Sequence, residues 1–297
     1  MFSGEQLKKT DIETLKRWVR NRLGGYQVMI ADIKTNNLLF RGVPWPERPT
    51  KVSQLSYPPP EKTPLGRANR PGQPMFYCSV APTAPFPELR AKPGELIALS
   101  EWKIKEGLWM HNLGYHQVAL QKLGTRNLTV RQRLSFPIAG ETKQNAKMRA
   151  DLSLAFTKDV CEGQEYYYKL SVVINELLYE KAGPIPKFPG GPKADCAAAT
   201  VYPSMQLRGD ADNVVIWPEF VDSSLEIKSV RYILVEATDQ TKPWYTMRTV
   251  AYADTFSGGD IIWRDEPLPE RKNRTHFYLE NDTWYLRDDF GNLIDAH

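Results

Sequence analysis

Cysteine and histidine are scarce in this chain of 297 residues, which has 3 of the first and 4 of the second. The cysteines are far apart, and none forms a Cys-x-x-Cys pair or lies at zinc-ligand spacing from a histidine: Cys78, Cys161 and Cys196. Only His111 and His116 are close in sequence, and no carboxylate separates them. We therefore expect neither a disulfide framework nor a metal site. We interpret the thiols as buried and free, and the histidines as polar residues of the surface or of strands.

Long apolar runs are also missing. No segment approaches the roughly 20 residues that a membrane helix needs, and the opening MFSGEQLKKTDIE lacks the apolar centre of a secretory signal. The 39 basic and 35 acidic residues leave a net charge of only +4, whereas a general nucleic-acid binder gathers its excess charge on one basic face. We expect a cytoplasmic protein that neither enters a membrane nor binds nucleic acid directly. Any anion-binding site in this protein must then depend on a local group of basic residues.

Several catalytic signatures are absent as well. The chain contains no Walker loop, no Rossmann glycine fingerprint, no HExxH and no nucleophile elbow. With 41% hydrophobic residues it can nevertheless bury a substantial core. The sequence thus describes a folded protein outside these large enzyme classes.

Two helices are predicted from apolar periodicity. Thr10 and Glu13 form a capping-box pattern, and the apolar residues that follow keep one helical face as far as the stop at Gly24-Gly25. A second helix is predicted over 167–178, after Gly163. The polar segment 115–150 has no period that we can assign, and we interpret it as an insertion.

Short apolar runs bounded by turn residues predict the strands. Before the long helix these are 26–33, 37–43, 75–78 and 95–100, and after it 198–203, 213–218, 230–237, 276–280 and 283–288. Strands on both sides of a helical middle, without regular alternation, favour an α+β fold.

Three features stand out as candidate sites, although each has an ordinary structural explanation. Arg41-Gly42 ends an apolar strand, so the guanidinium could bind a phosphate or simply cap the strand. Glu88 lies in the proline-rich APTAPFPELRAKPG, where restricted φ angles would fix it, yet solvated glutamates are common. Ser204 follows Tyr-Pro with no base nearby in sequence, which favours a polar cap over a nucleophile.

Together these features resemble a known family. The chain contains FRG at 40–42, GRANRPGQPMFY at 66–77, Glu88 eleven residues after Tyr77, and YPS followed by DNVVIWPE. This order is similar to that of the RES domain, which is named for shared Arg, Glu and Ser residues. The resemblance covers about Leu38 to Glu236 and implies an ADP-ribosyltransferase-like fold with a β-sheet core.

The resemblance also implies an activity. RES proteins are NAD-degrading toxins of toxin–antitoxin pairs, so it implies cleavage of the nicotinamide-ribosyl bond, with NAD as substrate and no other cofactor. Arg41 and Arg67 would bind the pyrophosphate, and Tyr77 would stack on the nicotinamide. Glu88 would stabilise the oxocarbenium-like ribose.

The remaining roles follow from the same resemblance. Ser204 would hydrogen-bond the ribose or the nicotinamide amide, and Gly42 would allow the backbone to approach the ligand. Gly66 and Gly72 would supply φ freedom to the loop. Asn69 and Asn213 are expected to tie loop backbones together.

We accordingly expect three parts: an N-terminal helix over 1–25, a RES domain over 26–237 with its insertion near 115–150, and a β-rich C-terminal extension over 238–297. A small antitoxin protein and a second copy of the chain are the implied partners. Water and phosphate are both open as acceptors. Two alternatives remain: transfer of ADP-ribose to a macromolecule, and a non-catalytic binding protein on a RES fold.

Overall fold

The computed structural model contains both helices and a large mixed β-sheet, with 30% of the described residues helical and 36% in strands. The predicted α+β class is therefore confirmed. No helix in the described part of the chain is long and apolar enough to cross a membrane. The described residues are 2–23, 30–125, 141–181, 196–239, 244–264, 273–280 and 283–294.

The chain forms two compact units, each assembled from three separate segments. The helical unit comprises Met1–Thr35, Pro58–Tyr77 and Glu106–Ser224, and the sheet unit comprises Asn36–Tyr57, Cys78–Lys105 and Leu225–His297. The three parts expected from the sequence were defined by the resemblance to the RES domain. A division of the chain into compact units does not test that resemblance. The boundaries of the three parts remain predictions.

The N-terminal segment forms two helices where the sequence predicted one. Helix α1 spans Gly4–Lys9 and helix α2 spans Ile12–Arg22. The predicted cap at Thr10 is wrong, because Thr10 ends α1 and donates its hydroxyl to the carbonyl of Gln6. Asp11 caps α2 instead, since its carboxylate accepts both the amide and the hydroxyl of Thr14, at 2.8 Å each. The predicted stop at Gly24-Gly25 lies outside the described residues.

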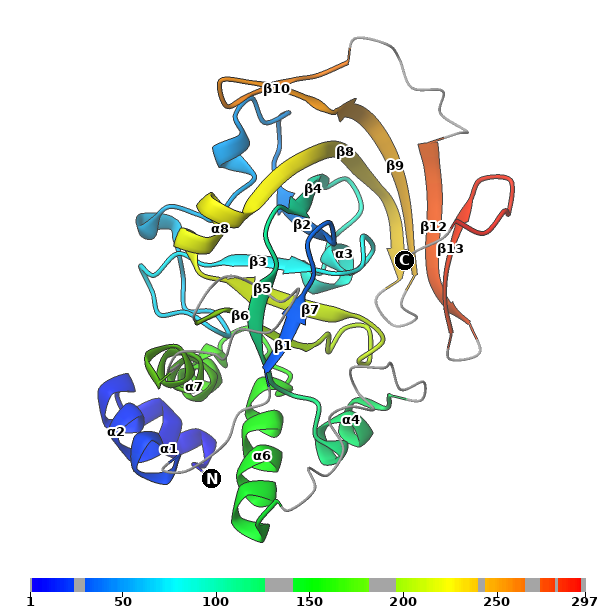
Figure 1. Ribbon diagram of the computed structural model, residues 1–297. Coiled ribbons are helices and arrows are strands. Elements are labelled where there is room, and N and C mark those ends of the chain that lie inside the picture. Colours follow the sequence, from blue (N-terminus) through cyan, green and yellow to red (C-terminus); the bar gives the residue numbers. More distant parts are fainter. Residues whose placement is uncertain are drawn as a thin grey trace. The chain divides into compact units, whose positions relative to one another are not determined.

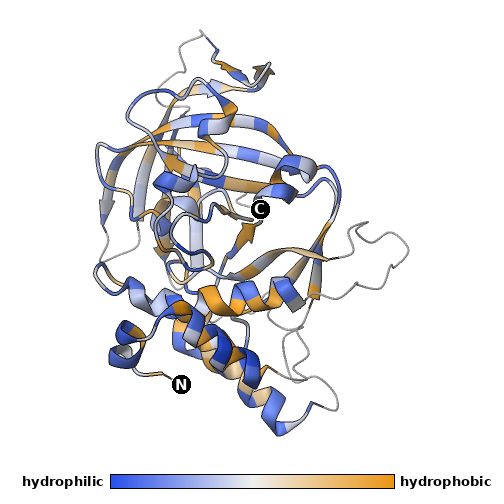
Figure 2. Cartoon of the chain, turned by 90° about the vertical axis from the view of Figure 1, so that its left-hand side faces the viewer, coloured by the Kyte–Doolittle hydropathy of each residue, from blue (hydrophilic) through white to orange (hydrophobic). Residues whose placement is uncertain are grey.

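Among the other helices of this unit, α7 (Tyr168–Lys181) packs against α2, α6 (Lys143–Phe156) packs against α7, and α4 (Gln117–Leu123) packs against α6. Helix α7 confirms the predicted long helix, follows the single turn η3 (Glu165–Tyr167) and lies alongside α2 (Figure 1). The segment 115–150 contains α4 and the start of α6. Figure 2 shows hydrophobic and hydrophilic residues mixed along the helices of this unit, and α7 is buried on all sides from Leu170 to Leu178.

The core of the helical unit lies between the helices and four strands. Leu15 of α2 and Leu177 of α7 are both fully buried there. The strand order is β1-β5-β6-β7, in which only β5 and β6 are parallel. The bounds are Ile30–Ile33 for β1, Leu108–Asn112 for β5, Ala197–Pro203 for β6 and Asp212–Ile216 for β7. Every residue of β6 and β7 is buried, including the polar Thr200, Asp212 and Asn213. Two short elements complete the unit, η2 (Pro60–Lys62) and α8 (Pro218–Ser224).

Neighbouring strands of the sheet unit are antiparallel, and β2 (Leu38–Pro44) lies between β3 (Phe76–Ser79) and β4 (Leu96–Ile104). The strands follow the order β3-β2-β4-β8-β9-β12-β13. The first two residues of β3 belong to the segment Pro58–Tyr77 of the helical unit. The other bounds are Leu225–Asp239 for β8, Trp244–Ala253 for β9, Arg274–Glu280 for β12 and Thr283–Asp288 for β13. Smaller elements are η1 (Val52–Gln54), α3 (Pro85–Glu88) and the hairpin of β10 (Thr255–Ser257) with β11 (Asp260–Ile262). The strands predicted in this unit are confirmed, and β9, β10 and β11 were not predicted.

Lys169 of α7 holds the end of α1. Its ammonium donates to the carbonyls of Leu7, Lys8 and Thr10 at 2.9, 3.1 and 3.0 Å. A cation at a helix C-terminus satisfies carbonyls that have no partner within the helix.

Replacing Lys169 with Met keeps the apolar stem but removes these three bonds. We expect Lys169→Met to lower the free energy of unfolding by about 1–2 kcal/mol, measured by urea denaturation. Lys143→Met, at an exposed position at the start of α6, is the control and should change it by less than about 0.5 kcal/mol. Equal effects of the two substitutions would contradict the assigned role.

Candidate functional site

The six candidate residues are divided equally between the two units. The helical unit contains Arg67, Tyr77 and Ser204, and the sheet unit contains Arg41, Gly42 and Glu88.

In the helical unit, Asn69 organises the loop over 66–72. Its side chain is 2% exposed, and its amide nitrogen donates to the carbonyls of Pro64 and Arg70, at 2.8 Å each. Its amide oxygen accepts the hydroxyl of Tyr77 at 2.7 Å. Asn69 thus ties the loop backbone together, as predicted. Gly72 has φ +75°, so the predicted conformational role of this glycine is confirmed as well.

Tyr77 fixes the other end of the loop. Its hydroxyl also accepts the amide of Ala68 at 2.9 Å, and its half-buried ring packs against the core of the helical unit. A Cβ on Gly66 would lie 2.3 Å from the Asn69 side-chain oxygen and 2.8 Å from the Tyr77 hydroxyl. Since Gly66 does not have positive φ, the prediction that it supplies φ freedom is wrong. Its lack of a side chain makes room for this hydrogen bond.

Arg67 is a buried cation in the same loop. The residue is 7% exposed, and its guanidinium donates to the carbonyls of Phe156 at 2.6 Å and Lys158 at 3.1 Å. The guanidinium carbon lies 5.0 Å from the ring centroid of Tyr168 and 5.8 Å from that of Tyr202. Within the described parts of the chain, no carboxylate pairs with Arg67. A buried charge held by neutral groups alone is well suited to accept an anion.

Ser204 closes the turn that follows β6. It is fully buried, and its hydroxyl oxygen accepts the amide of Leu207 at 3.2 Å. Its backbone carbonyl accepts the amide of Gly209 at 2.7 Å. The strand-end cap inferred from the sequence is therefore present. Through Tyr202, two residues earlier, the structure brings the YPS strand beside Arg67.

In the sheet unit, Arg41 lies at the centre of β2. Its side-chain Nε donates to the carbonyl of Ser56 at 3.1 Å, and its own carbonyl accepts the hydroxyl of Ser100 at 3.1 Å. Burial raises the pKa of Cys78 well above its ordinary value, and the Arg41 charge opposes this only in part. Cys78 is therefore a neutral thiol beside a cation, which does not suit a nucleophile.

Gly42 permits close packing against α3, the short helix that ends at Glu88. A Cβ at this glycine would lie 2.8 Å from Cβ of Pro85 and 3.1 Å from Cδ1 of Leu89. Gly42 was expected to allow its backbone to approach a ligand. In the structure, the backbone at Gly42 lies close to α3. As a result, the helix that carries Glu88 lies against the strand that carries Arg41. The Glu88 side chain is partly exposed, and its amide donates to the carbonyl of Ala84.

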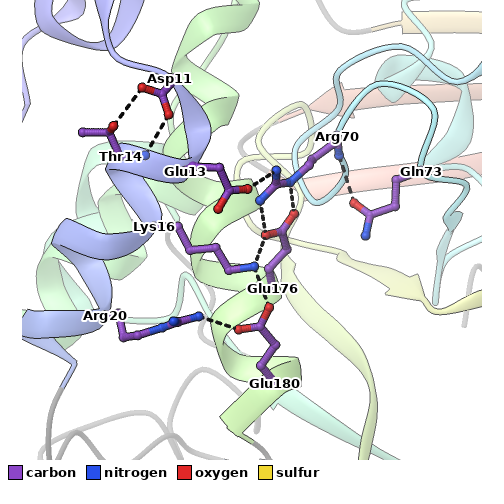
Figure 3. Close-up of polar contacts among 9 residues, drawn as sticks. All are labelled: Asp11, Glu13, Thr14, Lys16, Arg20, Arg70, Gln73, Glu176 and Glu180. Carbon is purple, nitrogen blue, oxygen red and sulfur yellow. Dashed lines mark hydrogen bonds and ion pairs between the residues drawn. The ribbon is translucent and has the colours of Figure 1, made fainter.

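A charge network that was not predicted anchors the Arg67 loop to the helices (Figure 3). Two nitrogens of Arg70 bind both carboxylate oxygens of Glu176 on α7, with a distance of 2.7 Å for the Nη2–Oε2 pair. Arg70 also bonds Glu13 of α2, while Lys16 of α2 donates to the same Glu176 carboxylate at 2.6 Å. Three segments of the chain therefore converge on Glu176.

The electrostatics of the network agree with this geometry. Burial raises the pKa of Glu176, but the hydrogen bonds and charges of Arg70 and Lys16 outweigh it and hold that pKa below its usual value. The bonds to Glu176 raise the pKa of Arg70, against the effect of burial. The one hint in the sequence was a glutamate inside the apolar run SVVINELL, where an unpaired charge would be costly.

Comparison of the chain with protein-family models, curated proteins and solved structures finds no match. The resemblance to the RES domain rests on the residue pattern of the chain itself.

Proposed function

We propose that this protein cleaves NAD at the bond between nicotinamide and ribose. The observation that carries the proposal is the buried guanidinium of Arg67, which has carbonyl and aromatic neighbours but no carboxylate partner among the described residues. A pyrophosphate is an anion that a guanidinium binds in bidentate fashion. The loop around Arg67 is held rigidly by Asn69 and Tyr77, and such preorganisation favours ligand binding.

The chemistry requires little beyond this anion site and one carboxylate. When the bond between ribose C1′ and nicotinamide breaks, its electron pair leaves with neutral nicotinamide and positive charge develops on the ribose. A carboxylate near that carbon stabilises the charge, and this is the role we assign to Glu88. An oxygen of water or phosphate then bonds to C1′, and water releases a proton in doing so.

The remaining candidates receive supporting roles. Arg41 contributes a second positive charge for the pyrophosphate. Tyr77 offers the exposed part of its ring to the nicotinamide, because its hydroxyl is already bonded within the loop. We assign Ser204, which is fully buried and whose hydroxyl oxygen accepts the backbone amide of Leu207, a hydrogen bond to the ribose or to the nicotinamide amide.

The proposal is tested by nicotinamide release from NAD, with and without added phosphate. We expect Glu88→Gln to lower kcat/KM by about 100-fold, because it removes a charge that acts mainly in the transition state. The matched control is Glu61→Gln, an exposed glutamate of η2, which should leave the rate unchanged.

The acceptor is identified from the products. Release that depends on phosphate indicates a phosphorylase, and release in its absence indicates a glycohydrolase. NAD labelled in its adenylate part distinguishes ADP-ribose transfer, since the label then stays on protein or nucleic acid in a cell extract. No nicotinamide release by folded wild-type protein would refute the proposal.

A further inference from the structure

Helices α2, α6 and α7 surround a cavity of about 470 Å³ within the helical unit. This volume is within the range of small-molecule sites. Its floor is apolar and is contributed by all three helices: Val19, Met148, Leu152, Leu170 and Ile174. None of the residues assigned to NAD cleavage lines it.

Two cations lie at the edge of this cavity. Arg22, at the end of α2, places its guanidinium carbon 3.6 Å from the ring centroid of Trp18, which also lines the cavity. Lys147 of α6 is the second cation and is exposed. In the part of the chain that the structure describes, neither cation has a carboxylate partner.

This lack of partners distinguishes the two cations from others nearby. On the same helix α2, Lys16 bonds Glu176 and Glu180, and Arg20 bonds Glu180 at 2.9 Å. Two positive charges beside an apolar floor complement a ligand with a negative head and an apolar body. Asp151 also lines the cavity and disfavours a ligand of high negative charge, because like charges repel.

We propose that this cavity binds an amphiphilic monoanion, a molecule with one carboxylate and an extended apolar body. The apolar body occupies the floor between the three helices, which removes apolar surface of both partners from water. The carboxylate binds Arg22 and Lys147 at the edge, where charge-assisted hydrogen bonds orient it. Stacking on Trp18 holds the Arg22 guanidinium in place before the ligand arrives.

The test uses decanoate as the probe, titrated into the full-length protein by calorimetry. Decanol and decyltrimethylammonium, which share the chain length but not the negative charge, serve as ligand controls. The key variant is Arg22→Gln/Lys147→Gln. Its matched control is Arg17→Gln/Lys143→Gln, which removes two cations from the same two helices at exposed positions that do not line the cavity.

We expect saturable binding of one decanoate per chain, and binding weaker by at least about tenfold in the Arg22/Lys147 variant. The control variant should bind as the wild type does. Met148→Trp, which fills the cavity, should abolish binding while urea denaturation shows that the protein is still folded. The absence of saturable binding, equal binding of decanol, or equal weakening in the control variant would each overturn the proposal. Because no step involves NAD, the outcome is independent of the proposed reaction.

Discussion

Replacement of Glu176 with Gln is expected to lower the free energy of unfolding by about 3 kcal/mol, the lower end of the range for breaking a buried ion pair. The Glu176 side chain is 8% exposed, and its carboxylate is shared by Arg70 and Lys16, whose side chains are 29% and 12% exposed. The neutral amide would leave two cations close together with their main counter-charge removed. Partial exposure of Arg70 keeps the expected loss from being larger.

Glu180→Gln is the matched control, since this glutamate lies one turn later on α7 and also bonds Lys16. Its side chain is 44% exposed, so its loss should lower the free energy of unfolding by no more than about 1 kcal/mol. Urea denaturation of the two variants at neutral pH gives the comparison. If Glu176→Gln is no more destabilising than Glu180→Gln, the network is not a structural anchor.

A double variant separates the ion pair from other effects of the substitution. Arg70→Met/Glu176→Gln removes both charges, and Lys16 keeps Glu180 as its partner. We expect the double variant to be destabilised by less than the sum of the single variants, because the uncompensated Arg70 charge is gone. Additive losses would show that Arg70 and Glu176 act independently.

The sequence was sufficient for most of the strands. β6 and β7 are buried at every position, and β2 and β3 follow turn residues, so apolar runs located them. β9 escaped prediction because WYTMRTVAYA mixes Thr and Arg with apolar residues. It pairs with the preceding strand β8, where Asp239 lies opposite Trp244, and with β12 on its other side.

Helix α6 shows why local pattern was insufficient elsewhere. Its buried side includes Arg149, which is bonded twice by Glu141, and Ser153. Arginine and serine are usually exposed. The apolar residues of this segment alone therefore form a face too narrow to predict a helix. Once an internal carboxylate neutralises the guanidinium, the same residues can be buried.

Part of the candidate site could likewise be predicted from the sequence. The Arg67 loop and the Ser204 turn were identified from glycine, proline and strand-end patterns. The anchor at Glu176 was not, because Arg70 and Glu176 are 106 positions apart and nothing local links them. Likewise, the steric reason for Gly42 depends on Pro85, a residue of another element.

His111 should make the protein sensitive to mild acid. It lies in β5 between β1 and β6, is 5% exposed, and neither ring nitrogen has a well-formed hydrogen bond within the described residues. Burial lowers the pKa of His111 to about 4, and the Leu178 backbone near the ring offsets this only in part. The ordinary pKa of histidine, about 6.5, applies to the unfolded chain. The unfolded state therefore takes up a proton at a pH where the folded state does not.

The direction of the effect follows from this difference. Stability is complete above about pH 6.5 and falls as the pH decreases towards 4, by about 3 kcal/mol in all. Urea denaturation between about pH 7.5 and pH 5 should show roughly 2 kcal/mol of this loss. His111→Leu removes the titrating group and should abolish most of that dependence, without a new unsatisfied polar atom in the core.

His116 provides the control for this experiment, because burial and the charge of Arg149 lower its pKa too, against the opposing charge of Glu141. His116→Asn retains the helix cap that the ring supplies to α4, where Nδ1 accepts the amide of Val118. The ring of His116 is far less buried than that of His111, so this variant should flatten the pH profile much less. If the two variants flatten it equally, or if His111→Leu leaves it unchanged, the acid sensitivity does not originate at the buried histidine of β5.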